Sequence, residues 1–113
     1  MSGEIQAQRF STWNGTYKTP TKSGIIIYTP TRIFPRVGSG GWVRVDGVRY
    51  WGVVASSRGI TGMTWYYGND STGPEAGRAT LTLQSDGSYA GSIQFTNRRG
   101  VIIDQGTVVF VLP

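Results

Sequence analysis

The chain has 113 residues, a formal net charge of +5 at pH 7, and neither cysteine nor histidine. This length suits one domain with a sizeable core. Without cysteine or histidine the chain cannot form disulfides, thiol nucleophiles, histidine-containing catalytic triads, or thiolate or imidazole metal sites, and we expect no metal and no cofactor. The 17 glycines and 12% aromatic residues suit an all-β protein rich in turns, and no segment repeats apolar residues at the helical period.

The beginning of the chain lacks targeting features. Residues 1–4 are polar and no apolar stretch follows them, so no signal peptide is expected. No apolar run approaches the roughly 20 residues of a membrane span. The sequence therefore predicts a flexible segment over residues 1–7, a single β-barrel domain over residues 8–113, a cytoplasmic location and no membrane partner.

Strand-like segments begin early in the chain. Residues 8–17 form the first predicted strand, which ends where proline and glycine appear in residues 19–24. Residues 25–28 are continuously apolar and form a second, shorter strand. Residues 33–35 extend the pairing briefly, and residues 37–40 connect to the next hairpin.

The strongest local signal is Asp46-Gly47, which stands between two runs of β-branched and aromatic residues. A type I′ turn needs positive φ at both central positions, and an Asp-Gly pair tolerates this. The two-residue loop sets Arg44 opposite Arg49, and side chains alternate between two faces. The face predicted to lie in the core carries Val43, Val45, Val48 and Tyr50. The opposite face, which we call the Trp/Arg face, carries Trp42, Arg44, Arg49 and Trp51.

The second half contains four more predicted strands. A strand over residues 60–67 is followed by the longest loop, over residues 68–77. The last strand covers residues 101–112, after a turn over residues 97–100. Gly106 marks an expected bulge in this last strand, because glycine inside a strand often does so.

The pattern between these segments defines another hairpin. A three-residue loop, Ser85-Asp86-Gly87, keeps the apolar residues of both strands on one face, whereas a two-residue loop would scatter them. The resulting pairs are Leu83 with Tyr89, Leu81 with Gly91, and Ala79 with Ile93.

Together these segments make about eight strands in sequential hairpins without a crossover helix. Short, regularly spaced strands with turn signals are typical of a barrel or a sandwich. A closed up-and-down barrel leaves no edge strand exposed. We therefore predict an all-β, eight-stranded antiparallel barrel, with a β-sandwich as the alternative. A barrel of this size is filled by side chains or holds one small ligand.

Three stretches carry a family resemblance. They read Gly59-Ile60-Thr61-Gly62-Met63-Thr64-Trp65-Tyr66, then Ala79-Thr80-Leu81-Thr82-Leu83 through Asp86-Gly87 to Ala90-Gly91-Ser92, and Ser11-Thr12-Trp13-Asn14-Gly15-Thr16-Tyr17. The first resembles the opening strand of the avidin and streptavidin family, and the second is similar to that family's next hairpin. The third resembles the strands of small calycin-type barrels in its glycine, tryptophan and tyrosine residues. The resemblance covers about a third of the chain and implies a calycin-like, ligand-binding barrel. Tyr67, Asn69 and Ser71 fall near the places where that family holds the ureido group of biotin, at a different spacing.

The acidic side chains offer little catalytic chemistry. Asp46 and Asp86 are interpreted as turn residues, whose carboxylates accept hydrogen bonds from nearby amides, and Asp70 and Glu75 lie in the long loop. Asp104 is expected at a strand end or bulge. No catalytic residue is predicted; if the chain is an enzyme, Asp104 is the candidate group of a cyclase-type barrel that works by shaping its substrate.

The charge distribution and the Trp/Arg face lead to the functional interpretation. Between Glu4 and Asp46 the chain has basic residues but no acidic one, which favours an anionic partner. We expect a non-catalytic barrel that binds a small aromatic or anionic ligand. The expected contact residues are Trp42, Arg44, Arg49, Trp51, Trp65 and Tyr67.

Two other functions stay open at this point. One is a nucleic-acid-binding barrel, in which bases stack on the tryptophans and the arginines contact phosphates. The other is the cyclase-type enzyme. The Trp/Arg face itself has three possible positions, namely inside the barrel, outside it, or in an interface between copies of a homo-oligomer.

Overall fold

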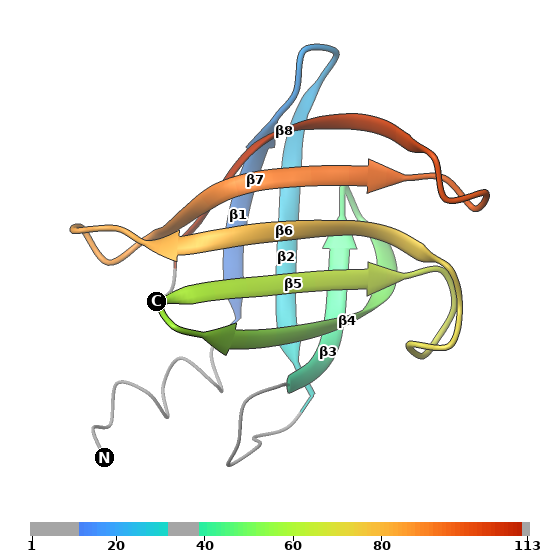
Figure 1. The fold of residues 1–113 in the computed structure, drawn as a ribbon, viewed down its shortest axis with the longest axis horizontal. Coiled ribbons are helices and arrows are strands. Elements are labelled where there is room, and N and C mark those ends of the chain that lie inside the picture. The colour runs from blue at the N-terminus through green and yellow to red at the C-terminus, as the bar shows by residue number, and fades with distance from the viewer. Residues whose placement is uncertain (1–11, 32–38, 112–113) are drawn as a thin grey trace.

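The computed structural model describes residues 12–31 and 39–111, which form a closed barrel of eight antiparallel strands (Figure 1). The strands are β1 (Trp13–Lys18), β2 (Ser23–Pro30), β3 (Ser39–Val45), β4 (Val48–Ser57), β5 (Ile60–Tyr66), β6 (Glu75–Leu83), β7 (Tyr89–Thr96) and β8 (Ile102–Val111). In Figure 1, β5, β6 and β7 run across the strands of the layer behind them, β1 to β3. Within these residues no helix is long and apolar enough to cross a bilayer.

Pairing between β1 and β8 closes the sheet, with Gly15 opposite Phe110. The predicted barrel is therefore confirmed, and the β-sandwich alternative is wrong because a sandwich would leave these two strands unpaired. The predicted N-terminal segment, the start of the first predicted strand and the pairing expected over residues 33–35 lie outside the described residues.

Both predicted hairpin registers are confirmed. Asp46 and Gly47 have φ values of 49° and 87°, and Trp42 lies opposite Trp51. In the second hairpin Leu81 lies opposite Gly91, and Gly87 has a φ of 88°. Local turn chemistry was sufficient in both places, because the left-handed positions determine loop length and therefore register.

Strand β6 begins earlier than predicted. Glu75 already pairs with Tyr66 across a register shift between Trp65 and Tyr66, so the long loop ends at Pro74 and not at residue 77. Gly77 explains the close packing here, because a Cβ at this position would lie 2.3 Å from the Trp65 ring. The sequence predicts that Gly77 belongs to a loop, but Gly77 lies inside β6 and allows the Trp65 ring to pack against the strand.

The predicted bulge at Gly106 is wrong. Gly106 pairs regularly with Ile93, and the register shift lies between Phe95 and Thr96, opposite the start of β8. Gly106 is required for another reason, since a Cβ there would lie 1.9 Å from the carbonyl oxygen of Lys18. Asp104 lies beside the shift, as expected for a bulge residue.

Aromatic rings fill one end of the barrel. The Trp13 ring stacks on Tyr89 at 5.4 Å between centroids and meets Tyr28 and Phe110 edge-on at 5.8 and 6.1 Å. Val43 and Val45 of the central hairpin are buried and Tyr50 packs against the core, as predicted. Val48 departs from the prediction at 56% exposed, because it follows the turn and reaches the rim at the opposite end.

The barrel interior provides a test of the fold. Leu81 is 0% exposed and Leu83, on the same side of β6, is 57% exposed at the barrel end. We expect Leu81→Ala to lower the free energy of unfolding by about 2–5 kcal/mol through lost burial and a cavity. Leu83→Ala should change it by no more than about 0.5 kcal/mol. Urea denaturation of both variants measures the difference, and equal effects would contradict the assigned interior.

Candidate functional site

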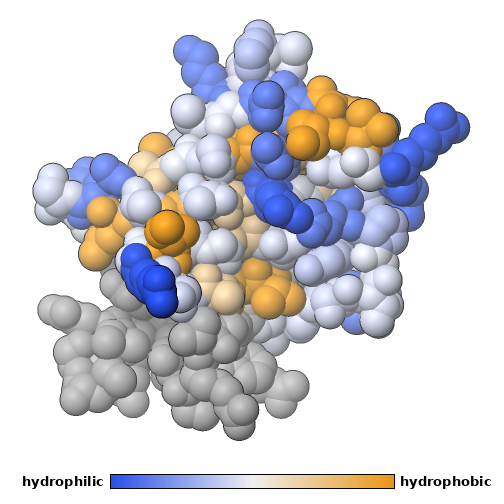
Figure 2. All heavy atoms as spheres, viewed as in Figure 1, coloured by the Kyte–Doolittle hydropathy of each residue, from blue (hydrophilic) through white to orange (hydrophobic). Residues whose placement is uncertain are grey.

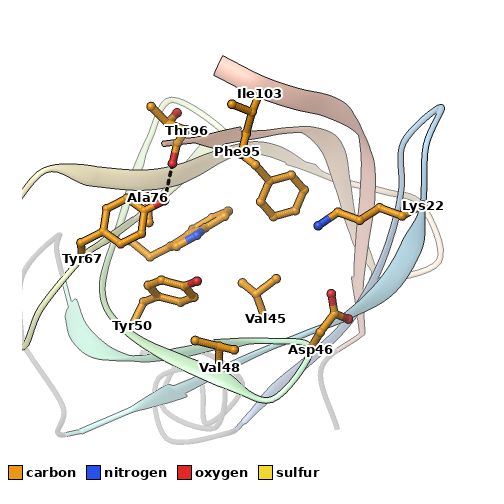
Figure 3. Close-up of a pocket in the computed structure, with 11 residues that line it drawn as sticks. Lys22, Val45, Asp46, Val48, Tyr50, Tyr67, Ala76, Phe95, Thr96 and Ile103 are labelled. Atoms are coloured by element: carbon orange, nitrogen blue, oxygen red, sulfur yellow. Dashed lines mark hydrogen bonds between the residues drawn. The ribbon is translucent and has the colours of Figure 1, made fainter. Parts of the chain in front are cut away.

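A half-open cavity of about 260 Å³ lies at the end of the barrel opposite the Trp13 ring cluster (Figure 3). The β1–β2, β3–β4 and β7–β8 turns and the β5–β6 loop surround this end, which we call the mouth. The cavity residues used below are Lys22, Asp46, Tyr50, Trp65, Tyr67 and Phe95. Three of these residues lie at or just beyond strand ends, so the fold brings together side chains that are far apart in the sequence.

Aromatic rings form most of the cavity wall. Tyr50 and Tyr67 meet edge-to-face at 5.8 Å between ring centroids, and Trp65 and Phe95 do so at 6.2 Å. The Tyr67 hydroxyl donates a 2.7 Å hydrogen bond to the Thr96 carbonyl oxygen, drawn in Figure 3. This bond ties the β5–β6 loop to β7, and the wall is therefore held in place before any ligand arrives.

Two hydrogen-bond donors of the wall have no acceptor in the part of the chain that the structure describes. Neither the Tyr50 hydroxyl nor the Trp65 indole N–H is hydrogen-bonded to a described residue. No fully buried side-chain nitrogen or oxygen of the described residues lacks a partner, and Figure 3 shows the Tyr50 hydroxyl directed into the cavity. Burial and the neighbouring Tyr67 raise the pKa of Tyr50, opposed by the positive charge of Arg98. Tyr50 is therefore a neutral donor at pH 7.

Lys22 adds a cation to the cavity. Its Nζ lies 4.7 Å from the Phe95 ring centre and 5.6 Å from that of Tyr17, and Figure 3 shows the side chain extending inward from the β1–β2 turn. Rings attract an ammonium through their negative faces. Among the described residues Lys22 makes no ion pair, although its charge contributes to lowering the pKa values of Asp46 and Asp104.

The carboxylate of Asp46 connects three strands. It accepts a short hydrogen bond from the Tyr17 hydroxyl and a 2.9 Å bond from the Ile25 amide. The hydrogen bond from Tyr17 is the main reason that the pKa of Asp46 lies below its ordinary value. Burial, followed by the bond to Asp46, raises the pKa of Tyr17 well above its usual range. Asp46 is thus more than a local turn residue, because its side chain joins the β3–β4 turn to β1 and β2.

Asp104 has its oxygens engaged in a similar way. Its Oδ2 accepts 2.7 Å hydrogen bonds from the hydroxyls of Thr19 and Thr21, and its Oδ1 accepts a 3.0 Å bond from the Gln105 amide. The hydroxyl bonds lower its pKa. A carboxylate held in this way stabilises the β1–β2 turn, which favours the structural interpretation over the catalytic one.

The six predicted contact residues do not form one face. Trp42, Arg44, Arg49 and Trp51 lie on the outer surface of the barrel, whereas Trp65 is 1% exposed inside it and Tyr67 lines the mouth. Trp65 and Tyr67 therefore do not extend the Trp/Arg face, since Trp51 pairs with Tyr66. Alternation along β5 therefore places residue 66, and not residues 65 and 67, beside the outer tryptophans.

Comparison of the chain with protein-family models, with curated proteins and with solved structures found no match. Of the three positions near the biotin contacts of the avidin family, Tyr67 lines the cavity, while Asn69 and Ser71 are exposed in the β5–β6 loop. Across the described residues, no three acidic side chains are grouped closely enough to hold a metal ion.

Sequence reasoning missed Lys22 and Phe95 as cavity residues. Lys22 stood in a segment interpreted only as a strand break, and Phe95 belonged to a strand without functional signal. Tyr50 was predicted to face the core, and that pattern was the one available indication of its place in the wall. The cavity arises where turns from distant parts of the chain meet, which strand patterns do not reveal.

Asp46→Asn tests the junction at the mouth. Asparagine tolerates the left-handed turn but removes the charge that strengthens the bonds from Tyr17 and Ile25, so we expect a loss of about 1 kcal/mol at pH 7, reduced by solvent screening. Because the folded pKa is lowered, the advantage of the wild type is complete above the ordinary value of 3.8. It should shrink as the pH falls through the lowered pKa.

Chemical denaturation between pH 7 and pH 2.5 measures this advantage. Asp86→Asn is the matched control, because Asp86 also sits in a turn but bonds only its neighbour Ser88. A larger stability loss in the Asp86 variant would contradict the assigned role of Asp46.

Proposed function

We propose that this barrel is a binding module that takes a small, flat, anionic molecule into its mouth. The observation that carries the proposal is a ring-walled cavity of about 260 Å³ into which the Lys22 ammonium and the Tyr50 hydroxyl point (Figure 3), with the Trp65 indole in its wall. Apolar walls with a few convergent polar groups are characteristic of small-ligand sites. The rings would contact the flat part of the ligand, and the donors would bind its carboxylate or a similar anion.

The hydrogen-bond donors of the cavity favour an anion over a cation. An aromatic wall by itself would suit an organic cation, but here the Lys22 ammonium already lies against the Phe95 ring. An incoming cation would meet like charge. The nearby carboxylates of Asp46 and Asp104 already accept hydrogen bonds from hydroxyls and amides of the protein. They are therefore less available to a ligand than the hydrogen-bond donors of the cavity.

A non-catalytic role agrees with the position of the acidic groups. Asp104, the candidate for a cyclase-type reaction, is engaged with Thr19 and Thr21 and is not among the residues that line the cavity. A ligand-binding barrel is also what the resemblance to the avidin and streptavidin family implies.

A pair of probes that differ only in charge tests the proposal. We expect 2-naphthoate to bind and to quench tryptophan fluorescence, and the neutral 2-naphthamide to bind at least about tenfold more weakly. Lys22→Gln should weaken naphthoate by about tenfold, the effect of losing one charged hydrogen bond of roughly 1.4 kcal/mol, and should leave the amide unchanged. Isothermal titration calorimetry provides the affinities.

Lys18→Gln is the matched control, because Lys18 is exposed on β1 and pairs with Thr107 on the outer surface. This variant removes the same charge without changing the cavity. The affinity for naphthoate should stay within about twofold of the wild-type value, because salt screens the interaction between the ligand and a distant surface charge. Equal binding of the two probes, or equal effects of the two lysine variants, would contradict an anion site at the mouth.

A further inference from the structure

The outer surface of the central hairpin carries an aromatic row that the cavity does not use. Register places Trp42 opposite Trp51, and Trp51 opposite Tyr66, so three rings stand on neighbouring strands β3, β4 and β5. All three are half-buried. Neighbouring strands are about 4.8 Å apart, so the row forms a continuous aromatic surface on the sheet.

The side chains of this surface are held by one another. The Arg49 guanidinium carbon lies 4.1 Å from the Trp42 ring centre, and Trp42 meets Trp51 edge-to-face at 5.2 Å. The Trp51 ring lies against Gly40, where a Cβ would come within 2.5 Å of it. An arginine stacked on a ring keeps its N–H groups pointing outward along the edge of the guanidinium plane, which is the edge that binds phosphate bidentately.

Both arginines of this surface lack an acidic partner among the described residues. Arg44 and Arg49 lie directly opposite each other, and neither makes an ion pair with a described residue. The acid at the end of the aromatic row, Glu75, is engaged by Arg78 at 2.7 Å. Like charges facing each other across a strand pair cost stability, and an anion placed between them would remove that cost.

We propose that the outer surface formed by Trp42, Trp51, Tyr66, Arg44 and Arg49 binds single-stranded nucleic acid. Flat bases would stack on the row of rings, and the two arginines, one step nearer the turn, would contact the phosphates. Aromatic rings beside cations on an open sheet provide this combination without base-specific contacts. The site is separate from the mouth, because alternation puts Val43 and Tyr50 on the opposite side of the same two strands.

The charge and the shape of this surface argue against two other occupants. A second copy of the chain packed about a two-fold axis would bring the same patch against itself, and its arginines would face like charges. A bilayer surface would require apolar side chains that project outward, whereas the next pair of outward side chains along these strands is the exposed Arg44 and Arg49.

The test uses a fluorescein-labelled dT20 oligonucleotide and fluorescence anisotropy between 50 and 200 mM NaCl. We expect binding with a linear loss of log affinity against log salt. The double variant Arg44→Gln/Arg49→Gln should bind at least about tenfold more weakly at the lowest salt. Its slope of log affinity against log salt should be smaller in magnitude by about 1.4, because each phosphate contact to a single strand contributes about 0.7 to that slope. Trp51→Leu should weaken binding by about fivefold or more through lost stacking.

Two control variants separate this surface from general charge and from the mouth. Arg78→Gln removes an outer-surface arginine that is already paired with Glu75, and Lys22→Gln removes the cavity cation. Both should bind the oligonucleotide within about twofold of the wild type. Thermal denaturation of each variant confirms that the barrel is retained.

Three results would overturn the proposal. They are no binding of dT20 at 50 mM NaCl, equal losses in the Arg44/Arg49 double variant and in Arg78→Gln, or unchanged affinity in Trp51→Leu. Flotation of the protein with phosphatidylserine vesicles would assign the surface to a membrane. A dimer that forms in the wild type and is lost in the double variant would assign it to a second copy of the chain. The naphthoate experiment is independent, because either site can fail while the other binds.

Discussion

The pairing of β1 with β8 is the constraint on which the rest of the structure depends. Once the sheet closes, every strand has one side turned inward and one turned to solvent, and strand alternation assigns each side chain to one of them. The inward residues must then fill a fixed volume. At one end they do so with the Trp13 cluster, while at the other they leave a cavity of about 260 Å³.

Carboxylates near the mouth stabilise the polypeptide itself. Asp46 joins the β3–β4 turn to Tyr17 and Ile25, and Asp104 holds the β1–β2 turn through Thr19 and Thr21. These bonds consume acceptors and leave donors in excess inside the cavity. The same arrangement that secures the turns therefore supports the preference for an anion that we propose for the mouth. Figure 2 shows the contrasting outer face over β5 to β7, where hydrophobic patches are separated by strongly polar residues.

The central hairpin has different chemistry on its two sides. Val43, Val45 and Tyr50 face the core and the cavity, while Trp42, Trp51 and the two arginines face outward. Because a sheet separates them, a ligand in the mouth and a strand of nucleic acid on the surface would not compete for a side chain. Coupling between the two sites would have to pass through the backbone of β3 and β4.

The local pattern was enough to determine eight strands, two turn types and their registers, because positive φ at Asp46, Gly47 and Gly87 is a short-range requirement. It also separated the Val/Tyr side of the central hairpin from its Trp/Arg side. Tertiary structure decided which side chains become neighbours. Tyr66, and not Trp65 or Tyr67, continues the outer aromatic row. Strand β6 begins at Glu75, and Lys22 and Phe95 meet in one cavity. Such contacts depend on barrel closure and on register shifts between strands that are distant in sequence, and alternation within a single strand carries no information about them.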